Sequence, residues 1–343
     1  MAKFSRPLKV TIMCILWYAL SSTNNVIGKK VLRSHPYPLT LSVFHMAANA
    51  FFMYPVLMLV GLQTRFHFSR HMLWRFIIPL GFGKLLGSVA SHVSIWRVSV
   101  SYAHTIKGML PIFTVTLSRI FYHEKQSTIV YLSLVPIVVG VAIATMTELS
   151  FEFYGMLSAV LATCTFAVQN LYSKTALKEA RLNPLQLLMK MSQVALFICV
   201  PLWILIDTTT MAHDPGLTEI NERFDLLFKL SLSGVINFMQ NIVAFSVLHL
   251  LSPLSYSVAN ATKRILVITV SLITLKNPVT LVNFFGMMLA VAGVFLYNRA
   301  KIYQNSKRKI LPTTNQDITE PHEEHHYVSS RYRMFNSKLN SFI

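Results

Sequence analysis

The chain has 343 residues, of which 53% are hydrophobic and only 13% are charged, and its mean hydropathy is +0.51. Because soluble domains carry about 25% charged residues, this composition excludes an ordinary soluble protein and indicates an integral membrane protein. The net charge of +18 would suggest nucleic-acid binding in a soluble protein, but membrane proteins concentrate basic residues in cytosolic loops, so we expect no nucleic-acid partner.

Ten apolar runs follow one another along the chain, at intervals too short for separate soluble domains. Each run is close to the roughly 20 residues that a helix needs to cross a bilayer. We therefore predict an all-α integral membrane protein with ten transmembrane helices. The predicted spans are 9–28, 38–61, 74–95, 99–121, 127–147, 153–175, 184–207, 226–248, 253–275 and 279–298.

The composition changes after the last span. Residues 301–343 contain few aliphatic side chains, and a basic run at 307–309 precedes an acidic and histidine-containing stretch. Low hydrophobicity combined with charge is typical of disordered segments. We expect a transmembrane transporter domain over residues 1–300 and a disordered cytosolic tail over residues 301–343.

The distribution of charge outside the spans predicts the orientation. The N-terminus, the even-numbered connections and the flank up to Lys309 hold most of the lysine and arginine, so both termini should face the cytosol. Lys29, Lys30 and Arg33 favour the opposite orientation locally. One odd-numbered connection is expected to hold a group of acidic residues, namely Asp207, Asp214, Glu219, Glu222 and Asp225.

The three cysteines, Cys14, Cys164 and Cys199, all lie inside apolar spans. A disulfide framework would need cysteines in loops that face an oxidising compartment. No group of histidine and cysteine has the spacing of metal ligands. We expect no disulfide, no metal site and no cofactor.

Three charged side chains lie near the middle of apolar runs: Lys107, and the adjacent pair Lys263 and Arg264. Each would cost about 2.5–3.5 kcal/mol if it faced lipid. Ionisable groups at that depth generally face an internal cavity and contact something negative. No other spanning run offers an obvious buried carboxylate, so the missing anion is most simply a substrate.

Helical spacing predicts one wall of the cavity. On the span 253–275, Ser257, Asn260 and Arg264 follow the i, i+3, i+7 pattern and share one face. Lys263 lies about 100° away from Arg264 around the helix. We therefore take Asn260 as a substrate-binding candidate together with the two cations.

A second wall is predicted on the span 99–121. His104 and Lys107 are three residues apart, and Ser101 and Thr105 lie on nearby positions. Ammonium groups, a guanidinium, amides and hydroxyls then converge without a carboxylate. This set suits a phosphate, because arginine binds its oxygens through two parallel hydrogen bonds while lysine adds compact charge.

Structural alternatives remain for these cations. They could bind carbonyl groups at helix C-termini, or lipid head groups. For Lys84 this alternative is about as well supported as a position in the transport pathway. Gly81, Gly83 and Gly87 can form a helix-packing face, beside which a lysine side chain can extend to the membrane surface.

The chain also repeats itself weakly. Residues 101–144 resemble residues 255–297, since a Ser-Tyr pair opens both segments and VVGV in the first matches VAGV in the second. Spans four and five thus match spans nine and ten. An offset of five spans inverts the second copy, and inverted repeats with a site at their interface are the usual plan of secondary transporters. The two predicted repeats cover about 9–147 and 153–298.

The segments around the candidate cations resemble a known family. The strings VSYAHTIKGMLPIF at 100–113 and SPLSYSVANATKRI at 252–265 are similar to the triose-phosphate translocator and nucleotide-sugar transporter group of the drug/metabolite transporter superfamily, in particular the E subgroup of solute carrier family 35. The resemblance covers about residues 10–300. It implies a ten-helix inverted-repeat exchanger that moves phosphorylated metabolites or nucleotide sugars by alternating access. It also implies that Lys107, Lys263 and Arg264 hold the substrate phosphate, as matching residues do in the plastid members.

The chain departs from the plastid members at two positions. Counting back without gaps, their additional histidine falls on Ser88 and their tyrosine on Gln240. Both replacements are uncharged, so we expect the distal part of the site to favour hydroxyl- or amide-rich groups over a second anionic end. Because no transit peptide is visible, the resemblance to non-plastid members implies a Golgi or endoplasmic reticulum membrane.

Other polar residues inside spans either line a pathway or join helices by hydrogen bonds, and the residue type does not decide between the two. Gln240 and Asn241 are the two that we include among the substrate-binding candidates. The whole set is Asn24, Asn25, His45, His92, Gln169, Asn170, Gln240 and Asn241.

Three functions fit these patterns to different degrees. The first is an organic-phosphate antiporter of an endomembrane, with a small phosphorylated substrate and membrane lipid as its partners. The second is a non-transporting membrane scaffold or receptor whose basic pocket binds an anionic lipid. A membrane-embedded transferase or hydrolase fits poorly, because spans 99–121 and 253–275 contain no carboxylate for acid–base chemistry. We expect a transporter and not an enzyme.

Overall fold

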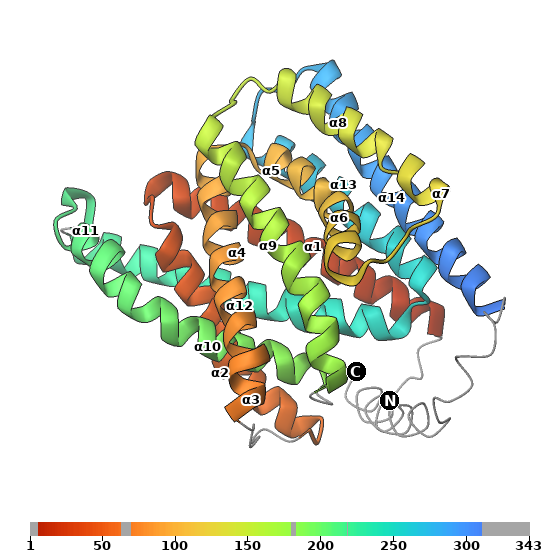
Figure 1. Cartoon of the computed structure of the whole chain (residues 1–343). Coiled ribbons are helices and arrows are strands. Elements are labelled where there is room, and N and C mark those ends of the chain that lie inside the picture. The colour runs from red at the N-terminus through yellow and green to blue at the C-terminus, as the bar shows by residue number, and fades with distance from the viewer. Residues whose placement is uncertain (1–5, 63–69, 180–182, 218, 311–343) are drawn as a thin grey trace.

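The computed structural model describes residues 6–62, 70–179, 183–217 and 219–310, and these residues form helices and no strand. Each predicted span coincides with one helix or with a short series of successive helices (Figure 1). The helices are α1 (Arg6–Ser34), α2 (Pro38–Leu59), α3 (Arg70–Met72), α4 (Ile78–Arg97), α5 (Val100–Ile106), α6 (Leu110–Tyr122), α7 (Thr128–Leu132), α8 (Val135–Met146), α9 (Phe153–Glu179), α10 (Pro184–Trp203), α11 (Thr209–Ala212), α12 (Ile220–Leu250), α13 (Pro253–Leu275) and α14 (Leu281–Ile310).

Eight helical stretches of the described chain are long and apolar enough to cross a membrane. This finding agrees with an all-α integral membrane protein, the fold class that the composition predicts. The two predicted spans outside this set are 99–121, which a tight turn divides into α5 and α6, and 153–175, which corresponds to α9. The eight stretches are Leu8–Ser34, Pro38–Leu59, Arg70–Arg97, Thr128–Met146, Pro184–Ala212, Ile220–Leu248, Leu254–Leu275 and Leu281–Lys307.

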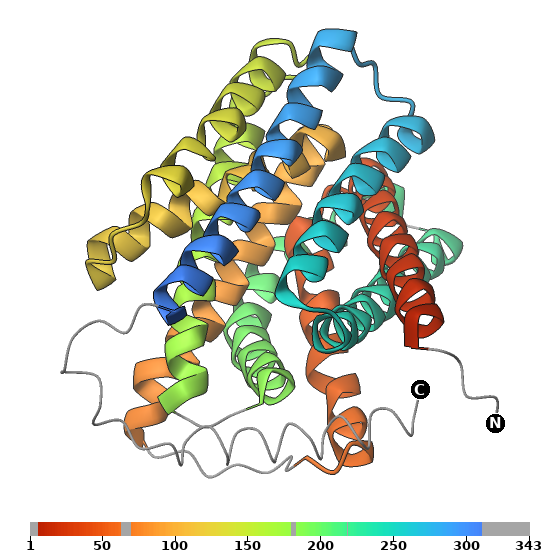
Figure 2. The same cartoon turned by 90° about the vertical axis from the view of Figure 1, so that its right-hand side faces the viewer.

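Large apolar side chains cover much of the outer surface. Phe51, Trp74, Phe121 and Phe197 are each at least 66% exposed, as residues facing lipid are expected to be. The first turn of α1 and the last turn of α14 lie at the same end of the bundle in Figures 1 and 2. Helix α14 continues past Lys301 to Ile310, so the predicted tail begins as a helix, and residues 311–343 lie outside the described part of the chain.

The helices pack in pairs along most of their length. Helix α4 lies against α9, α8 against α14, α2 against α10, and α1 against α12. Glycines permit the closest approach: a Cβ atom on Gly140 would lie 2.4 Å from the backbone nitrogen of Ala290, and one on Gly293 would lie 2.7 Å from that of Ile137. Backbone contact of this kind requires small residues, and it draws α8 and α14 together.

Lys29, which opposed the predicted orientation, is a buried capping residue. Its ammonium donates hydrogen bonds to the carbonyl oxygens of Ile95, Trp96 and Val98 at 2.7, 3.0 and 2.8 Å. Carbonyl groups at a helix C-terminus lack partners within the helix and attract positive charge. Lys29 therefore joins the end of α1 to the end of α4. This contact explains why a lysine lies there although it opposes the predicted orientation.

Asp207 differs from the expectation that it belongs to a connection. It lies in a π-helical turn between α10 and α11, within the membrane-length stretch Pro184–Ala212, and it is buried. One of its carboxylate oxygens accepts hydrogen bonds from the backbone nitrogen and the hydroxyl of Thr40, both at 2.7 Å. A buried carboxylate is thus present in a span, and Thr40 satisfies it.

Candidate functional site

The fourth predicted span is interrupted at its lysine. Helix α5 ends at Ile106, a 3₁₀ turn covers Lys107–Met109, and α6 begins at Leu110. Pro111 explains the interruption, because its ring cannot fit against the carbonyl four residues earlier in an α-helix, which is that of Lys107. The charged side chain therefore projects from a break between two helices.

The arginine of α13 meets this break. A Cβ atom on Gly108 would lie 3.4 Å from Nη1 of Arg264, and the same nitrogen donates to the carbonyl oxygen of His104 at 3.5 Å. Arg264 is also close enough to Lys107 and Lys263 for their positive charges to interact. The structure thus brings together the three cations that the sequence places on two distant spans.

Among the described residues, the hydrogen-bond and ring partners of these cations are neutral. The ammonium of Lys107 donates to the hydroxyl of Ser91 on α4 at 2.9 Å. The ammonium of Lys263 lies 4.4 Å from the centre of the Trp17 indole ring on α1, which is a cation–π contact. The ion pairs of the described residues involve none of the three, and they join Arg75 to Glu179, Arg97 to Glu152, Lys229 to Asp225 and Lys301 to Glu124.

His104 and Asn260 have different surroundings. The Nε2 atom of His104 lies 2.9 Å from Oδ1 of Asn25, so its ring is held by α1. Asn260 is partly buried on the α13 face predicted from its spacing. Ser257 on that face is buried, and its hydroxyl has no hydrogen-bond partner among the described residues. An unpaired buried hydroxyl can bind a ligand or a water molecule.

The remaining candidates lie on α4 and α12. Ser88 is partly buried, three residues before Ser91 on α4. The Oε1 atom of Gln240 is buried and has no hydrogen-bond partner in the part of the chain that the structure describes. Asn241 instead donates to Oδ1 of Asn49 at 2.8 Å, and Asn49 donates to Asn237 at 2.9 Å. Asn241 therefore takes part in an interhelical amide cluster between α2 and α12.

A group of interior residues is only partly buried although their helices place them inside the bundle. Each keeps some accessible surface, and exposed apolar residues mark the lipid-facing positions of α1, α4, α12 and α13. Charged residues inside membrane bundles generally line water-accessible space. The group comprises Asn25, Lys84, Ser88, His104, Lys107, Gln240, Asn260, Lys263 and Arg264.

Sequence reasoning missed Trp17 and Ser91, the two partners of the lysines. Trp17 is 2% exposed and stacks on Tyr256 with ring centres 5.6 Å apart. Neither residue stands out in the sequence, because both are uncharged and neither carries the cost of a charge in lipid. Their roles depend on contacts between helices that are far apart along the chain.

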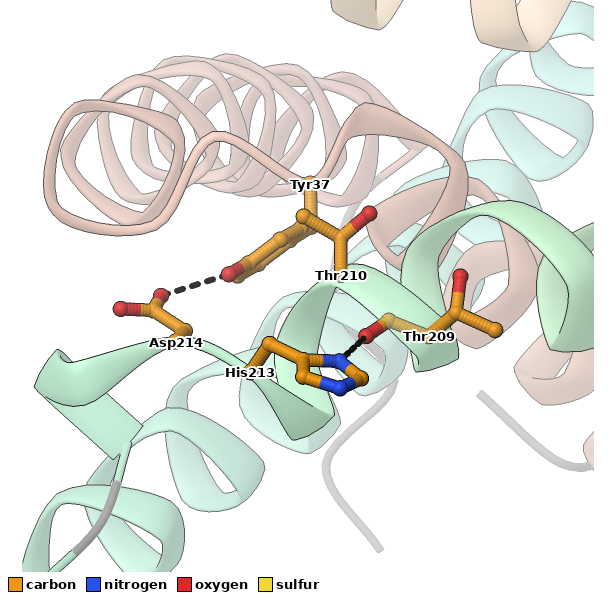
Figure 3. A pocket seen from close by; sticks show the side chains of 5 residues that line it. All are labelled: Tyr37, Thr209, Thr210, His213 and Asp214. Carbon is orange, nitrogen blue, oxygen red and sulfur yellow. Dashed lines mark hydrogen bonds between the residues drawn. The ribbon is translucent and has the colours of Figure 1, made fainter.

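A separate pocket of about 610 Å³ lies where α1 meets α2 and α11 meets α12 (Figure 3). The Tyr37 hydroxyl donates to a carboxylate oxygen of Asp214 at 2.5 Å, and this hydrogen bond, with one from the backbone N–H of Gly216, lowers the pKa of Asp214. The pocket is open and contains no lysine or arginine, so it does not suit a phosphate. Its lining consists of Tyr37, Thr209, Thr210, His213 and Asp214.

Metal chemistry finds no support in the described residues, which contain no group of three histidine, cysteine or carboxylate side chains placed to hold an ion. The three cysteines are free, and Cys199 is fully buried. The groups that converge at the α5–α6 break can bind an anion by charge and by hydrogen bonds.

Comparisons with known proteins agree with this chemistry. The model of the triose-phosphate transporter family matches residues 8–298. The chain is 33% identical over 305 residues to glucose-6-phosphate/phosphate translocator 1 of Arabidopsis thaliana, covering 87% of this chain and 76% of that protein. It is 36% identical to phosphoenolpyruvate/phosphate translocator 2 of the same plant, with coverage of 87% and 79%. It is 31% identical to the triose phosphate/phosphate translocator of Flaveria trinervia, with coverage of 88% and 74%.

These three relatives are named as chloroplastic translocators, which confirms the expectation of a transporter and not an enzyme. One solved structure, described only as a crystal structure of a protein, has a TM-score of 0.55 and 13% identity, and covers 87% of this chain and 98% of its own. At that identity the likeness concerns the fold alone.

Proposed function

Because the chain belongs to the triose-phosphate transporter family, we propose that it exchanges phosphorylated metabolites across a membrane by phosphate-linked antiport. One observation carries this proposal: Arg264 meets the α5–α6 break beside Lys107, Lys263 is its neighbour on α13, and among the described residues the hydrogen-bond and ring partners of these cations are neutral. A phosphate dianion supplies the missing negative charge. The guanidinium can bind two of its oxygens while the two ammonium groups bind the others.

The same charges explain exchange in place of one-way transport. Two like charges 4 Å apart repel by about 1 kcal/mol in water and by about 4 kcal/mol at the lower effective dielectric of a protein. An empty cavity holding three cations therefore resists the loss of water that closure requires. A bound phosphate neutralises the cations and lets the cavity close. Each change of access from one side of the membrane to the other therefore carries a substrate.

We also propose ten spans arranged as two inverted repeats, and the packing of the helices supports this arrangement. If each span is matched with the span five positions later, counting on from span ten to span one, α4 corresponds to α12, α9 to α1, and α10 to α2. The α4–α9 pair then corresponds to the α12–α1 pair, and the α4–α10 pair to the α12–α2 pair. The same step turns the α6–α9 pair into the α13–α1 pair, and it maps the α8–α14 and α2–α10 pairs onto themselves. All of these pairs are in contact.

Local details follow the same relation. Helices α5 and α13 begin at serine caps, Ser99 and Ser252, and α6 and α13 end at left-handed residues, His123 with φ 51° and Lys276 with φ 50°. The number of residues from the first to the second member is the same for the two caps, for the two left-handed residues, and for Gly140 and Gly293. The contact of Gly140 with Ala290 is accordingly repeated, with the helices exchanged, by that of Gly293 with Ile137.

This spacing also shows how the two lysines correspond in the proposed repeats. It aligns Lys107 with Asn260 and not with Lys263, so the two lysines do not occupy equivalent positions of the repeats. The site is therefore asymmetric: one repeat contributes a single cation from a helix break, and the other contributes an adjacent pair from the continuous helix α13.

For the orientation we propose that both termini face the cytosol. In a variant lacking Cys14, Cys164 and Cys199, a cysteine at Ser306 on α14 should react with a membrane-impermeant maleimide in sealed vesicles whose cytosolic face is outside. A cysteine at Ala212, the last residue of α11, should react only after the vesicles are opened. Both positions are exposed. Equal reactivity of both in sealed vesicles would contradict the proposed topology.

For the location we propose a Golgi or endoplasmic reticulum membrane. Ser88 and Gln240 stand where the plastid members resembled by this chain have a histidine and a tyrosine, which supports a substrate, and hence a compartment, different from theirs. Light microscopy of a tagged protein beside markers of the Golgi, the endoplasmic reticulum and plastids tests this proposal, and accumulation in plastids would reject it.

Exchange in reconstituted liposomes tests the function itself. Liposomes preloaded with inorganic phosphate should take up labelled phosphate and phosphorylated sugars rapidly, whereas liposomes without internal substrate should not. A panel of sugar phosphates and nucleotide sugars as external competitors then identifies the class of substrate. Absence of exchange with every member of the panel, together with tight retention of anionic lipid, would favour the scaffold or receptor function.

A further inference from the structure

Lys84 lies on the interior side of α4. Phe82 and Leu86 on the same helix are 54% and 37% exposed and mark the face that meets lipid. At 100° per residue, Lys84 points about 160° away from both of them. It shares the opposite face with Ser88 and Ser91, at the i, i+4, i+7 spacing. The snorkelling alternative requires the lipid side, so this geometry excludes it.

The helix-packing glycines do not enclose this lysine. A Cβ atom on Gly81 would touch Val194 of α10, and one on Gly87 would touch Phe166 of α9, so these two glycines serve close packing. A Cβ atom on Gly83 would meet nothing within 4 Å. Lys84 itself is partly exposed, within a face that points into the bundle. Lys84 therefore keeps some accessible surface on the interior face of α4.

Within the described residues, Lys84 forms no hydrogen bond and no ion pair. It differs in this respect from Lys29, which three carbonyl groups bind, and from Lys107, which Ser91 binds. An unpaired charge in the interior of a membrane bundle is costly and generally marks a ligand or ion pathway. Lys84 is thus a fourth cation, on the same face of α4 as Ser91, the partner of Lys107.

Resting on the proposed phosphate exchange, we propose that Lys84 forms a second anion-binding subsite, so that the preferred substrates carry a phosphate at one end and another acidic group at the other. Lys84 precedes Ser91, the partner of Lys107, by seven residues, which is about 10 Å along the helix axis. A chain of about six carbons spans such a separation. A carboxylate or a second phosphate at its far end would pair with the Lys84 ammonium.

This subsite changes the expectation drawn from Ser88. The serine removes the positive charge that a histidine could bear, but Lys84 restores a charge one helical turn away on the same face. The distal part of the site therefore combines the hydroxyl of Ser88 with a cation. A hydroxylated chain that ends in an acid fits it better than an uncharged sugar does.

Two probes that differ at the far end of one carbon chain test the proposal: glucose 6-phosphate, and 6-phosphogluconate, which ends in a carboxylate. Each is used as an external competitor of labelled phosphate uptake into liposomes preloaded with phosphate. The wild-type protein should bind 6-phosphogluconate at least tenfold more tightly than glucose 6-phosphate. Lys84→Gln should bring the two within about twofold, mainly by weakening 6-phosphogluconate, and Lys84→Arg should keep the preference.

The controls separate the proposed second subsite from the proposed phosphate exchange on which it rests. Exchange of phosphate for phosphate measures the Lys107 site and should persist in Lys84→Gln, while Lys229→Gln removes a charge that Asp225 pairs at the surface. Failure of phosphate exchange in the wild-type protein would reject the proposed function. Normal phosphate exchange without a wild-type preference for 6-phosphogluconate, or an equal loss for both competitors in Lys84→Gln, would reject the second subsite alone.

Discussion

Replacing Lys107 or Lys263 with glutamine should abolish phosphate-linked exchange while leaving the protein inserted and folded. Hydrogen bonds to charged groups contribute about 1.5–3 kcal/mol each, so the loss of one ammonium weakens phosphate binding by roughly ten- to a hundredfold. The remaining cations then no longer neutralise the dianion, and closure over the substrate becomes unfavourable. Insertion should not suffer, because removing a buried charge lowers the cost of crossing the bilayer.

Arg264→Lys separates charge from geometry at the same site. It keeps the positive charge but removes the planar pair of donors, so substrate affinity should fall while some exchange persists. Initial rates of exchange at several external phosphate concentrations distinguish the two classes of variant. Lys229→Gln is the matched control for loss of a lysine outside the site. Exchange at the wild-type rate in all three site variants would show that these cations do not bind the substrate.

Gly140→Ala should destabilise the protein by about 3 kcal/mol, or prevent folding, because the added methyl meets backbone. Its Cβ atom would lie 2.4 Å from the nitrogen of Ala290 and 2.7 Å from the carbonyl oxygen of Gly286. Neither atom can move unless α8 separates from α14. Thermal unfolding in detergent, followed by the loss of the monodisperse peak in size-exclusion chromatography, measures the effect.

Gly83→Ala is the matched control, because nothing lies within 4 Å of its added methyl. Alanine is favoured over glycine in a helix interior by about 1 kcal/mol, so this variant should be slightly stabilised. The two substitutions are chemically identical and should act in opposite directions. Equal stability of the two variants would mean that the α8–α14 contact is looser than the structure indicates.

The hydrophobic runs were sufficient to locate the helices, because the cost of exposing backbone polar groups to lipid leaves helices as the available structure for a long apolar segment. The break at Lys107 had a signal in the sequence as well, because Pro111 follows Lys107 by four residues and cannot continue an α-helix there. Lys29 and Asp207 were harder to interpret. Their positions depend on the α4 carbonyls and on Thr40, which lie far away along the chain.

The candidate site was predictable to the extent that charge in lipid is costly. That cost singled out Lys107, Lys263 and Arg264, and the structure brings them together. It could not single out Trp17 or Ser91, which are neutral and carry no such penalty. Nor could it separate Asn241, an amide in an interhelical cluster, from Gln240, whose oxygen has no partner. Only the packing of α12 against α2 makes that distinction.

Among the described residues no carboxylate pairs with the three cations, and this also bears on how transport responds to voltage. The cations remain in the membrane, so the charge moved in one cycle is the difference between the two substrates that change places. Swapping one phosphate dianion for another moves no net charge. A substrate with one further ionised acid group, exchanged for inorganic phosphate, carries one extra elementary charge, and each 100 mV of membrane potential then shifts the exchange equilibrium by about 2.3 kcal/mol. Exchange of such substrates would be electrogenic, and the side on which they accumulate would depend on the polarity of the membrane.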